Sequence, residues 1–202
     1  HRVSAEVDRT WEIAAVCRRV FQKIPPANRP GLFFERVRGS EIPLVAGVLG
    51  GSPEIYALAL QTEVDRIGEK WRKVQPVEPE IWAEGPCQEV VLEGDRVDLD
   101  LLPIPVWTVG HDPGPYITAP CVVTKDPETG QVNVGTYRMQ VKAKAKTGLL
   151  FGPAQDIVRH IAKNERQNRS TPVAVVLGPD PSVSATSVAK IVHGPSEYEI
   201  AG

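Results

Sequence analysis

The sequence has little cysteine and no long apolar run. Its three cysteines, Cys17, Cys87 and Cys121, are far apart and odd in number. This spacing argues against a disulfide framework and against a zinc site, and it favours the cytoplasm. We expect each cysteine to be a buried, small apolar residue. No apolar stretch approaches the roughly 18 residues that a membrane-spanning helix needs, so the sequence predicts no membrane segment.

The sequence also lacks an excess of basic residues. Its 202 residues include 23 lysines and arginines against 25 aspartates and glutamates, which leaves a formal net charge of −2. A nucleic-acid-binding surface needs a basic excess to neutralise phosphates, so this balance argues against nucleic acid as a partner. The length suffices for one large domain or two modest ones that fold around their own cores.

Hydrophobic periodicity predicts an N-terminal α/β subdomain over residues 1–80. Apolar residues at helical spacing predict two helices, and apolar runs between breakers predict two strands. Three prolines between residues 76 and 86 indicate a linker at its end. The expected elements are a helix over 10–22, strands over 32–37 and 43–49, and a long helix over 53–73.

Residues 81–202 change to alternating apolar and polar positions, which predicts strands. Consecutive hairpins favour an antiparallel sheet or a small barrel with α/β additions. Prolines at alternate positions of 102–107 predict an extended strap that Trp107 anchors. The other expected elements are hairpins over 89–99 and 116–144, a helix over 155–167, a buried strand over 172–177 and a short helix over 182–191.

The end of the longer hairpin carries residues that point to ligand binding. Asn133 and Gly135 are poor strand formers inside a strong strand pattern, which is typical of close approach to a ligand or of a bulge. Arg138 is permanently charged and suits a phosphate or a carboxylate. Because Asn133 and Arg138 are five residues apart, a regular strand would point them to opposite faces. Either Gly135 forms a bulge, or the two residues serve different sides.

Together these motifs resemble the UbiD family of reversible (de)carboxylases, and the resemblance covers nearly the whole chain. It implies an N-terminal α/β subdomain over 1–80, followed by a flavin-binding split β-barrel of the flavin-reductase type over 81–202. The motifs that carry it are Leu32–Glu35, Leu101–Pro105, Tyr116–Thr118, Lys125–Gly130, Asn133–Val141, Pro172–Gly178 with Asp180 and Pro181, and Ser196–Tyr198 with Ala201 and Gly202.

The resemblance implies a cofactor and the residues that bind it. The family uses prenylated FMN, held through its phosphate together with a divalent metal, Mn or Mg, and often a potassium ion. Asn133 and Glu197 match two of the family's metal ligands, and their oxygen atoms suit a hard cation. Arg138 matches the catalytic arginine between flavin and substrate carboxylate. The residues that match cofactor contacts are Thr118, Asn133, Thr136, Arg138 and Ser187.

One metal ligand of the family has no counterpart. The family's metal-binding histidine aligns with Ala154, whose methyl group cannot ligate a cation. Gln155 or Asp156 could supply an oxygen ligand instead, and His160 lies a turn and a half further on. Asp156 is also explained as a first-turn helix residue whose charge interacts favourably with the helix dipole.

The leading hypothesis is a fragment of a UbiD-type carboxy-lyase that acts non-oxidatively and reversibly on an aromatic or α,β-unsaturated carboxylic acid. Family members are more than twice as long, so we expect both ends of the chain to be cut. The acids that assist Arg138 and a C-terminal domain for homo-oligomerisation are expected after residue 202. The chain alone is therefore expected to be inactive.

Two alternative hypotheses come from other classes of protein. Ala154 favours a non-catalytic structural or assembly subunit of a multi-subunit carboxylase that has lost metal binding. A plain FMN-binding redox protein on a split barrel would explain the hairpins, but it would not explain Asn133, Arg138 and Glu197 together.

Overall fold

The computed structural model describes residues 1–191 and 194–202, which form two compact units that interleave along the sequence. The first unit comprises His1–Tyr56, Pro79–Ile117 and Gln140–Gly148, and the second comprises Ala57–Glu78, Thr118–Met139 and Leu149–Gly202. Within these residues there are three sheets of three strands each, and none closes into a barrel. The α/β character is confirmed, whereas the split barrel and the boundary at residue 80 stay predictions.

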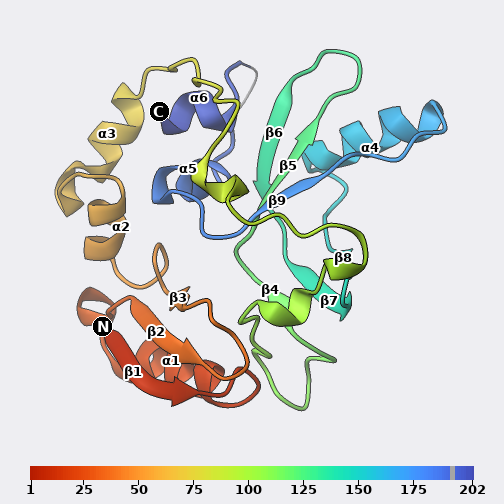
Figure 1. Cartoon of the computed structure of the whole chain (residues 1–202). Coiled ribbons are helices and arrows are strands. Elements are labelled where there is room, and N and C mark those ends of the chain that lie inside the picture. Colours follow the sequence, from red (N-terminus) through yellow and green to blue (C-terminus); the bar gives the residue numbers. More distant parts are fainter. Residues whose placement is uncertain (192–193) are drawn as a thin grey trace. The chain divides into compact units, whose positions relative to one another are not determined.

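A sheet in the order β1-β2-β3 organises the first unit (Figure 1). β1 (Arg2–Val7) pairs in parallel with β2 (Leu32–Val37), and β3 (Leu44–Ala46) pairs antiparallel with β2. β2 and β3 were expected, although β3 is shorter than predicted. β1 was not expected, although Val3, Ala5 and Val7 alternate with polar residues as a half-buried strand requires.

Helix α1 (Glu12–Lys23) lies along one face of this sheet, where a helix was predicted (Figure 1). Its buried residues Ile13 and Cys17 are four apart and so share one helical face. Burial raises the pKa of the Cys17 thiol to about 11, so the thiol stays protonated at neutral pH. The core of this unit consists of Val7, Ile13, Cys17, Leu32, Phe34 and Val37.

The proline-rich strap over 102–107 is anchored as predicted. Ile104 is buried, and Trp107 packs against the core of the first unit. The Trp107 Nε1 donates a hydrogen bond of 3.0 Å to the carbonyl oxygen of Tyr116. The strap is thereby tied to a second sheet, in the order β4 (Tyr116–Ile117), β7 (Met139–Ala143) and β8 (Lys146–Leu149).

The hairpin predicted over 89–99 is wrong. Short 3₁₀ turns occupy this region instead, at Pro86–Gln88, Gly94–Arg96 and Leu99–Leu101. Val90 to Leu92 are exposed and pair with no strand of the described chain. An apolar triplet has strand preference only where a neighbouring strand accepts it. Cys87, expected to be buried, is exposed, whereas Cys17 and Cys121 are buried as expected.

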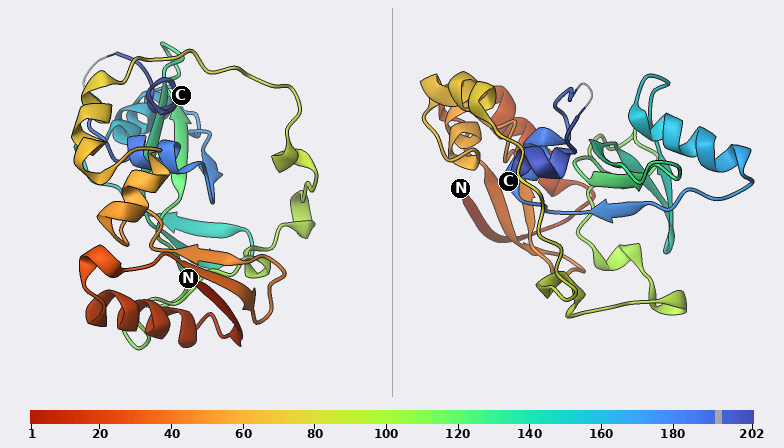
Figure 2. Two further views of the ribbon diagram at one scale, coloured as in Figure 1. Left: turned by 90° about the vertical axis from the view of Figure 1, so that its left-hand side faces the viewer. Right: turned by 90° about the horizontal axis from the view of Figure 1, so that it is seen from above.

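The long helix predicted over 53–73 is also wrong, because the chain turns in its middle. It forms α2 (Pro53–Ala59), a 3₁₀ turn and α3 (Ile67–Lys73), and Figure 2 shows extended chain after α3. Gln61 adopts the left-handed conformation, with φ of 51°. Its N–H donates to Leu58 O, and the N–H of Thr62 donates to Ala57 O, which is the Schellman pattern that ends a helix.

The second unit is built on a sheet in the order β6-β5-β9. β5 (Cys121–Lys125) pairs antiparallel with both β6 (Val132–Thr136) and β9 (Ala174–Val176). The long hairpin predicted over 116–144 is therefore divided between two sheets, with β4 and β7 in the other. The segment predicted as a buried strand is an edge strand instead, with Val173, Val175 and Leu177 exposed.

Three helices accompany this sheet. α4 (Asp156–Arg166) was predicted, and it contacts β5 and β6. α5 (Pro181–Thr186) is shorter than predicted, and α6 (Glu197–Ala201), which contacts α5 and β6, was not expected. No helix of residues 1–191 and 194–202 has the length and apolar character needed to cross a membrane.

Replacing Gln61 with glycine should stabilise the chain. The left-handed conformation strains a non-glycine residue by roughly 1–2 kcal/mol, and the greater freedom of unfolded glycine offsets about 0.5–1 kcal/mol of this gain. We expect the free energy of unfolding to rise by about 0.5–1 kcal/mol in urea denaturation. The control is Gln167→Gly, because Gln167 has φ of −94° and no such strain to lose. Equal destabilisation by both variants would contradict the assignment.

Candidate functional site

Strand β6 carries two of the predicted site residues, Asn133 and Thr136, and its pairing with β5 is regular. The register runs without interruption from Lys125 opposite Val132 to Cys121 opposite Thr136. The bulge considered at Gly135 is therefore wrong. Side chains alternate between the faces of a regular strand, so Asn133 and Gly135 share one face while Thr136 lies on the other.

Asn133 lies on the face of β6 toward α4. Its side-chain nitrogen Nδ2 is buried and has no hydrogen-bond partner in the described chain. Leaving a buried donor without an acceptor is unfavourable by about 1–3 kcal/mol. The residue opposite on β5 is Thr124, whose hydroxyl is 2.9 Å from Nδ1 of the buried His160 on α4. Burial lowers the pKa of His160, so its ring is neutral at pH 7.

Tyr137 follows β6 on the same face and is buried. Burial raises the pKa of its phenol above the ordinary value, and the neighbouring Asn133 side chain opposes this rise. The backbone of Ile157, in the first turn of α4, also lowers this pKa, so the phenol lies close to that turn. The negative charges of Asp156 and Glu197 also act on Tyr137, so both carboxylates lie near this phenol.

Glu197 lies at the open edge of β6. One of its carboxylate oxygens, Oε2, accepts a hydrogen bond of 2.9 Å from the backbone N–H of Val134. Burial raises the pKa of Glu197, hydrogen bonding to backbone N–H groups opposes the rise, and the charge of Asp156 adds to it. Glu197 opens α6, where Ser196 and Glu199 form a reciprocal capping box that fixes the start of the helix. The structure thus brings Asn133, Asp156 and Glu197 to one place.

Thr136 and Ser187, both predicted to contact the cofactor, meet on the other side of β6. Their hydroxyl oxygens are 2.7 Å apart. The Ser187 hydroxyl donates to the carbonyl oxygen of Ser184 at 2.8 Å, so the Thr136 hydroxyl is the donor between the two. This arrangement leaves an acceptor lone pair on Thr136 and holds both hydroxyls in fixed positions.

The predicted substitutes for the missing histidine have different surroundings. Ala154 lies exposed in the turn before α4. The Gln155 side-chain oxygen accepts a hydrogen bond of 2.6 Å from the N–H of Gly152 and so closes the local turn. Asp156 forms an exposed ion pair of 3.2 Å with Arg159 and lies close enough to Glu197 for its charge to raise that pKa. Of the two substitutes, Asp156 is therefore the one whose charge acts on Glu197.

Arg138 and Thr118 lie apart from these contacts. Both are exposed. Arg138 follows β6, and its backbone oxygen accepts a hydrogen bond of 3.2 Å from Leu150. Within residues 1–191 and 194–202 its guanidinium has no hydrogen bond or ion pair, which leaves all five donors available. Thr118 lies in the break between β4 and β5 and contacts none of the other site residues through a hydrogen bond.

The donor set favours oxygen ligation without forming a complete metal centre. Asn133 and Glu197 offer an amide and a carboxylate oxygen, and Asp156 adds a second carboxylate nearby, a combination that suits a hard divalent cation. In the part of the chain that the structure describes, no three His, Cys, Asp or Glu residues are arranged to hold a metal ion. A cation here would rely on the Asn133 amide and on oxygen atoms from a bound phosphate or water.

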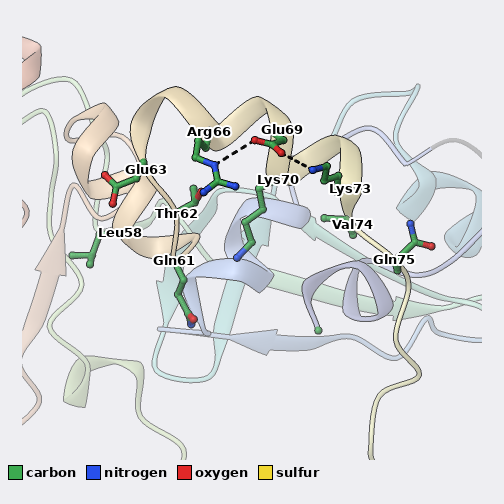
Figure 3. A pocket seen from close by; sticks show the side chains of 11 residues that line it. Leu58, Gln61, Thr62, Glu63, Arg66, Glu69, Lys70, Lys73, Val74 and Gln75 are labelled. Carbon is green, nitrogen blue, oxygen red and sulfur yellow. Dashed lines mark hydrogen bonds and ion pairs between the residues drawn. The ribbon is translucent and has the colours of Figure 1, made fainter.

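A cavity of about 660 Å³ in the second unit lies elsewhere, along α3 (Figure 3). Its charged residues are engaged with one another: Glu69 pairs with Arg66 at 3.3 Å and with Lys73 at 2.5 Å. Lys70 donates to the carbonyl oxygen of Leu60. Its basic residues therefore do not form a free anion site, and none of the predicted site residues lines it.

Sequence reasoning missed Tyr137, Thr124 and the role of Gly135. A side chain at position 135 would collide with the Tyr137 ring, with its Cβ 2.6 Å from Cε2. The glycine therefore makes room for an aromatic ring two residues later. That signal, a glycine followed at the next same-face position by a tyrosine, is present in the sequence.

Comparison with known proteins decides the family. Residues 1–74 match the N-terminal domain, and residues 80–202 the Rift-related domain, of 3-octaprenyl-4-hydroxybenzoate carboxy-lyase. The chain belongs to the UbiD family. The sequence is 32% identical over its full length to a phenolic acid decarboxylase of Escherichia coli O157:H7, and 35% identical over 87% of its length to one of Streptomyces sp. (strain D7).

Solved UbiD structures share the fold. The UbiD-class enzyme HmfF of Pelotomaculum thermopropionicum, solved with FMN, matches the whole chain with a TM-score of 0.87 and 34% identity. Vanillic acid decarboxylase of Sedimentibacter hydroxybenzoicus, in its closed form, matches with a TM-score of 0.89 and 31% identity. The chain covers 44% of each of these two structures, and 44% and 39% of the two decarboxylases above.

An ion pair holds α4, which carries Asp156, onto the β5–β6 turn. Lys163 Nζ lies 2.6 Å from Asp126 and 2.9 Å from Glu128. The hydrogen bond from Lys163, with help from backbone N–H groups of the turn, lowers the pKa of Asp126 from 3.8 to about 2. A depressed carboxyl pKa contributes stability above the unfolded value, and this contribution disappears as the pH falls from 3.8 through 2.

Lys163→Met should therefore raise the pKa of Asp126 toward 3.8 and reduce the loss of stability between pH 4 and pH 2. NMR titration of the Asp126 carboxyl and thermal unfolding across this range would measure both effects. Lys146→Met, which removes an exposed lysine without a described ion pair, is the control and should change neither. An unchanged Asp126 titration in the Lys163 variant would disprove the coupling.

Proposed function

We propose that the chain is the flavin- and cation-binding part of a UbiD-type decarboxylase that acts on an aromatic or α,β-unsaturated carboxylic acid. The reaction is non-oxidative and reversible, and the cofactor is prenylated FMN. The observation that carries the proposal is the convergence of Asn133, whose buried amide nitrogen has no partner, with Glu197 and Asp156. Relatives described as phenolic and vanillic acid decarboxylases, and the UbiD structure with FMN, support the substrate class and the flavin.

The chain's own residues would bind and orient the reactants. Asn133 and Glu197 would hold a divalent cation, Mn or Mg, with Asp156 replacing the histidine that is missing at Ala154. A divalent cation held there, and a potassium ion beside it, would supply positive charge for the phosphate of the cofactor. An oxygen of the bound cofactor would give the Asn133 Nδ2 its missing acceptor. Thr136 and Ser187 would bind the flavin on the other side of β6.

Arg138 would orient the substrate. Its exposed guanidinium has free donors and can grip a carboxylate at two points. The bound flavin supplies the electron sink that the departure of CO₂ requires. The acids that exchange protons with the substrate would come from the rest of the full-length protein, which we propose to be a cytoplasmic homo-oligomer.

A non-catalytic assembly subunit is the second candidate. Ala154, and the lack of three grouped His, Cys, Asp or Glu residues among the described positions, favour it. Titrating the full-length protein with FMN and Mn²⁺, followed by flavin fluorescence and by the EPR signal of free manganese, separates the two. Saturable binding of both would exclude the assembly subunit, and no binding of either would exclude the decarboxylase.

Arg138→Ala in the full-length protein should abolish decarboxylation while leaving the melting temperature unchanged, because the side chain is exposed and has no described partner. Arg138→Lys should recover only a small part of the activity, since an ammonium group cannot grip a carboxylate at two points. Release of CO₂ from a panel of aromatic and unsaturated acids is the measurement. Wild-type turnover by the alanine variant would remove Arg138 from the site.

A further inference from the structure

Tyr137 occupies a position that the proposed function leaves unexplained. Tyr137 is buried. In the sequence it lies between Thr136, which we assign to the cofactor, and Arg138, which we assign to the substrate. Core tyrosines of this kind usually fill space and place the hydroxyl at a convenient acceptor. Here the phenol lies close to the Asn133 side chain and to the first turn of α4.

The path of the ring follows from the spacing of the residues. Positions 133, 135 and 137 fall on one face of the strand direction, because side chains alternate along a strand. At 135 there is only a hydrogen atom, and the Tyr137 ring lies back across this gap. A Cβ at 135 would come within 2.6 Å of Cε2 and closer still to Cζ and the hydroxyl oxygen. The ring tip therefore covers Gly135 and reaches toward Asn133.

The ring tip lies close to two elements. Asn133 belongs to β6, and Ile157 follows Asp156 in the first turn of α4. A ring tip packed against both limits how the amide of Asn133 and the backbone that carries Asp156 can move relative to each other. Groups behind the ligands of a metal site act in this way, and their loss typically weakens metal binding about 10–100-fold.

We propose that Tyr137 is a positioning residue whose ring, admitted by Gly135, holds the Asn133 amide and the first turn of α4 in the arrangement that the cation and the cofactor phosphate require. This inference rests on the proposed function. It gives Gly135 and Tyr137 a shared role, which is to position the residues that bind the cation and the cofactor.

The decisive variant is Tyr137→Phe in the full-length protein, because it keeps the ring and removes only the hydroxyl. We expect Mn²⁺ affinity, measured by EPR, to fall by about tenfold or more, with FMN affinity reduced alongside it. Loss of one hydroxyl with the ring retained lowers stability only modestly, so the melting temperature should change by a few degrees at most. Tyr116→Phe, in strand β4, is the matched control and should leave both affinities unchanged.

A second pair of variants tests the role of the gap. Gly135→Ala should displace the ring and weaken Mn²⁺ binding as Tyr137→Phe does, because the colliding atoms are the far end of a movable side chain. In a Tyr137→Ala background the same change should add no further loss of stability, since no ring remains to collide. Equal destabilisation by Gly135→Ala in both backgrounds would contradict the contact.

The outcomes distinguish this inference from the proposed function. If the wild-type protein binds neither Mn²⁺ nor FMN, the proposed function fails and the inference fails with it. If the wild-type protein binds both and Tyr137→Phe binds them equally well, only the positioning role is overturned. Weakened binding in Tyr137→Phe with a nearly unchanged melting temperature would support the positioning role, because a purely structural residue would lower both together.

Discussion

The candidate site depends on the register between β5 and β6. Side chains alternate between the faces of β6, so Asn133 faces α4 while Thr136 meets the end of α5, and the open edge between them meets Glu197. A slip of one residue would exchange the two faces and separate all of these groups. The register is secured at the hairpin turn, where Asp126 accepts two backbone N–H groups and pairs with Lys163 of α4.

The sequence predicted elements where one periodic pattern ran without interruption. Helices α1 and α4 and strand β2 were found for this reason. The failures have separate physical causes. A left-handed Gln61 ends α2, although glutamine is an ordinary helix residue and carries no stop signal. Val90 and Val91 have strong strand preference, yet they pair with no strand among residues 1–191 and 194–202. The alternation of Val3, Ala5 and Val7 is typical of a strand such as β1, but the segment is short and its partner β2 lies about 30 residues further along the chain, so no local hairpin signal supports it.

Some residues of the site could be predicted from the sequence, and others could be identified only from the structure. Asn133 and Gly135 stood out because they interrupt a strand pattern. From a single sequence, a glycine that forms a bulge cannot be distinguished from a glycine that leaves space for an aromatic ring. The register of β6 is regular, so Gly135 leaves space for the ring of Tyr137. The contact of Glu197 with β6 spans 63 positions, so no local spacing could predict it, and it entered only through the resemblance to a family. Tyr137 was overlooked because a tyrosine in a strand has an ordinary structural explanation.

Asn133, Asp156 and Glu197 lie at the edge strand β6, and this position favours ligand binding over burial in a core. An exposed strand edge invites pairing with another strand, and proteins usually cover it or place charge there. Here Glu197 covers one N–H of the edge and brings a negative charge beside that of Asp156, which raises the pKa of Glu197 further. Among the described residues no lysine or arginine pairs with Glu197, so the two carboxylates repel without compensation. A cation held by these residues and the Asn133 amide would relieve this repulsion, so this edge suits a positively charged ligand.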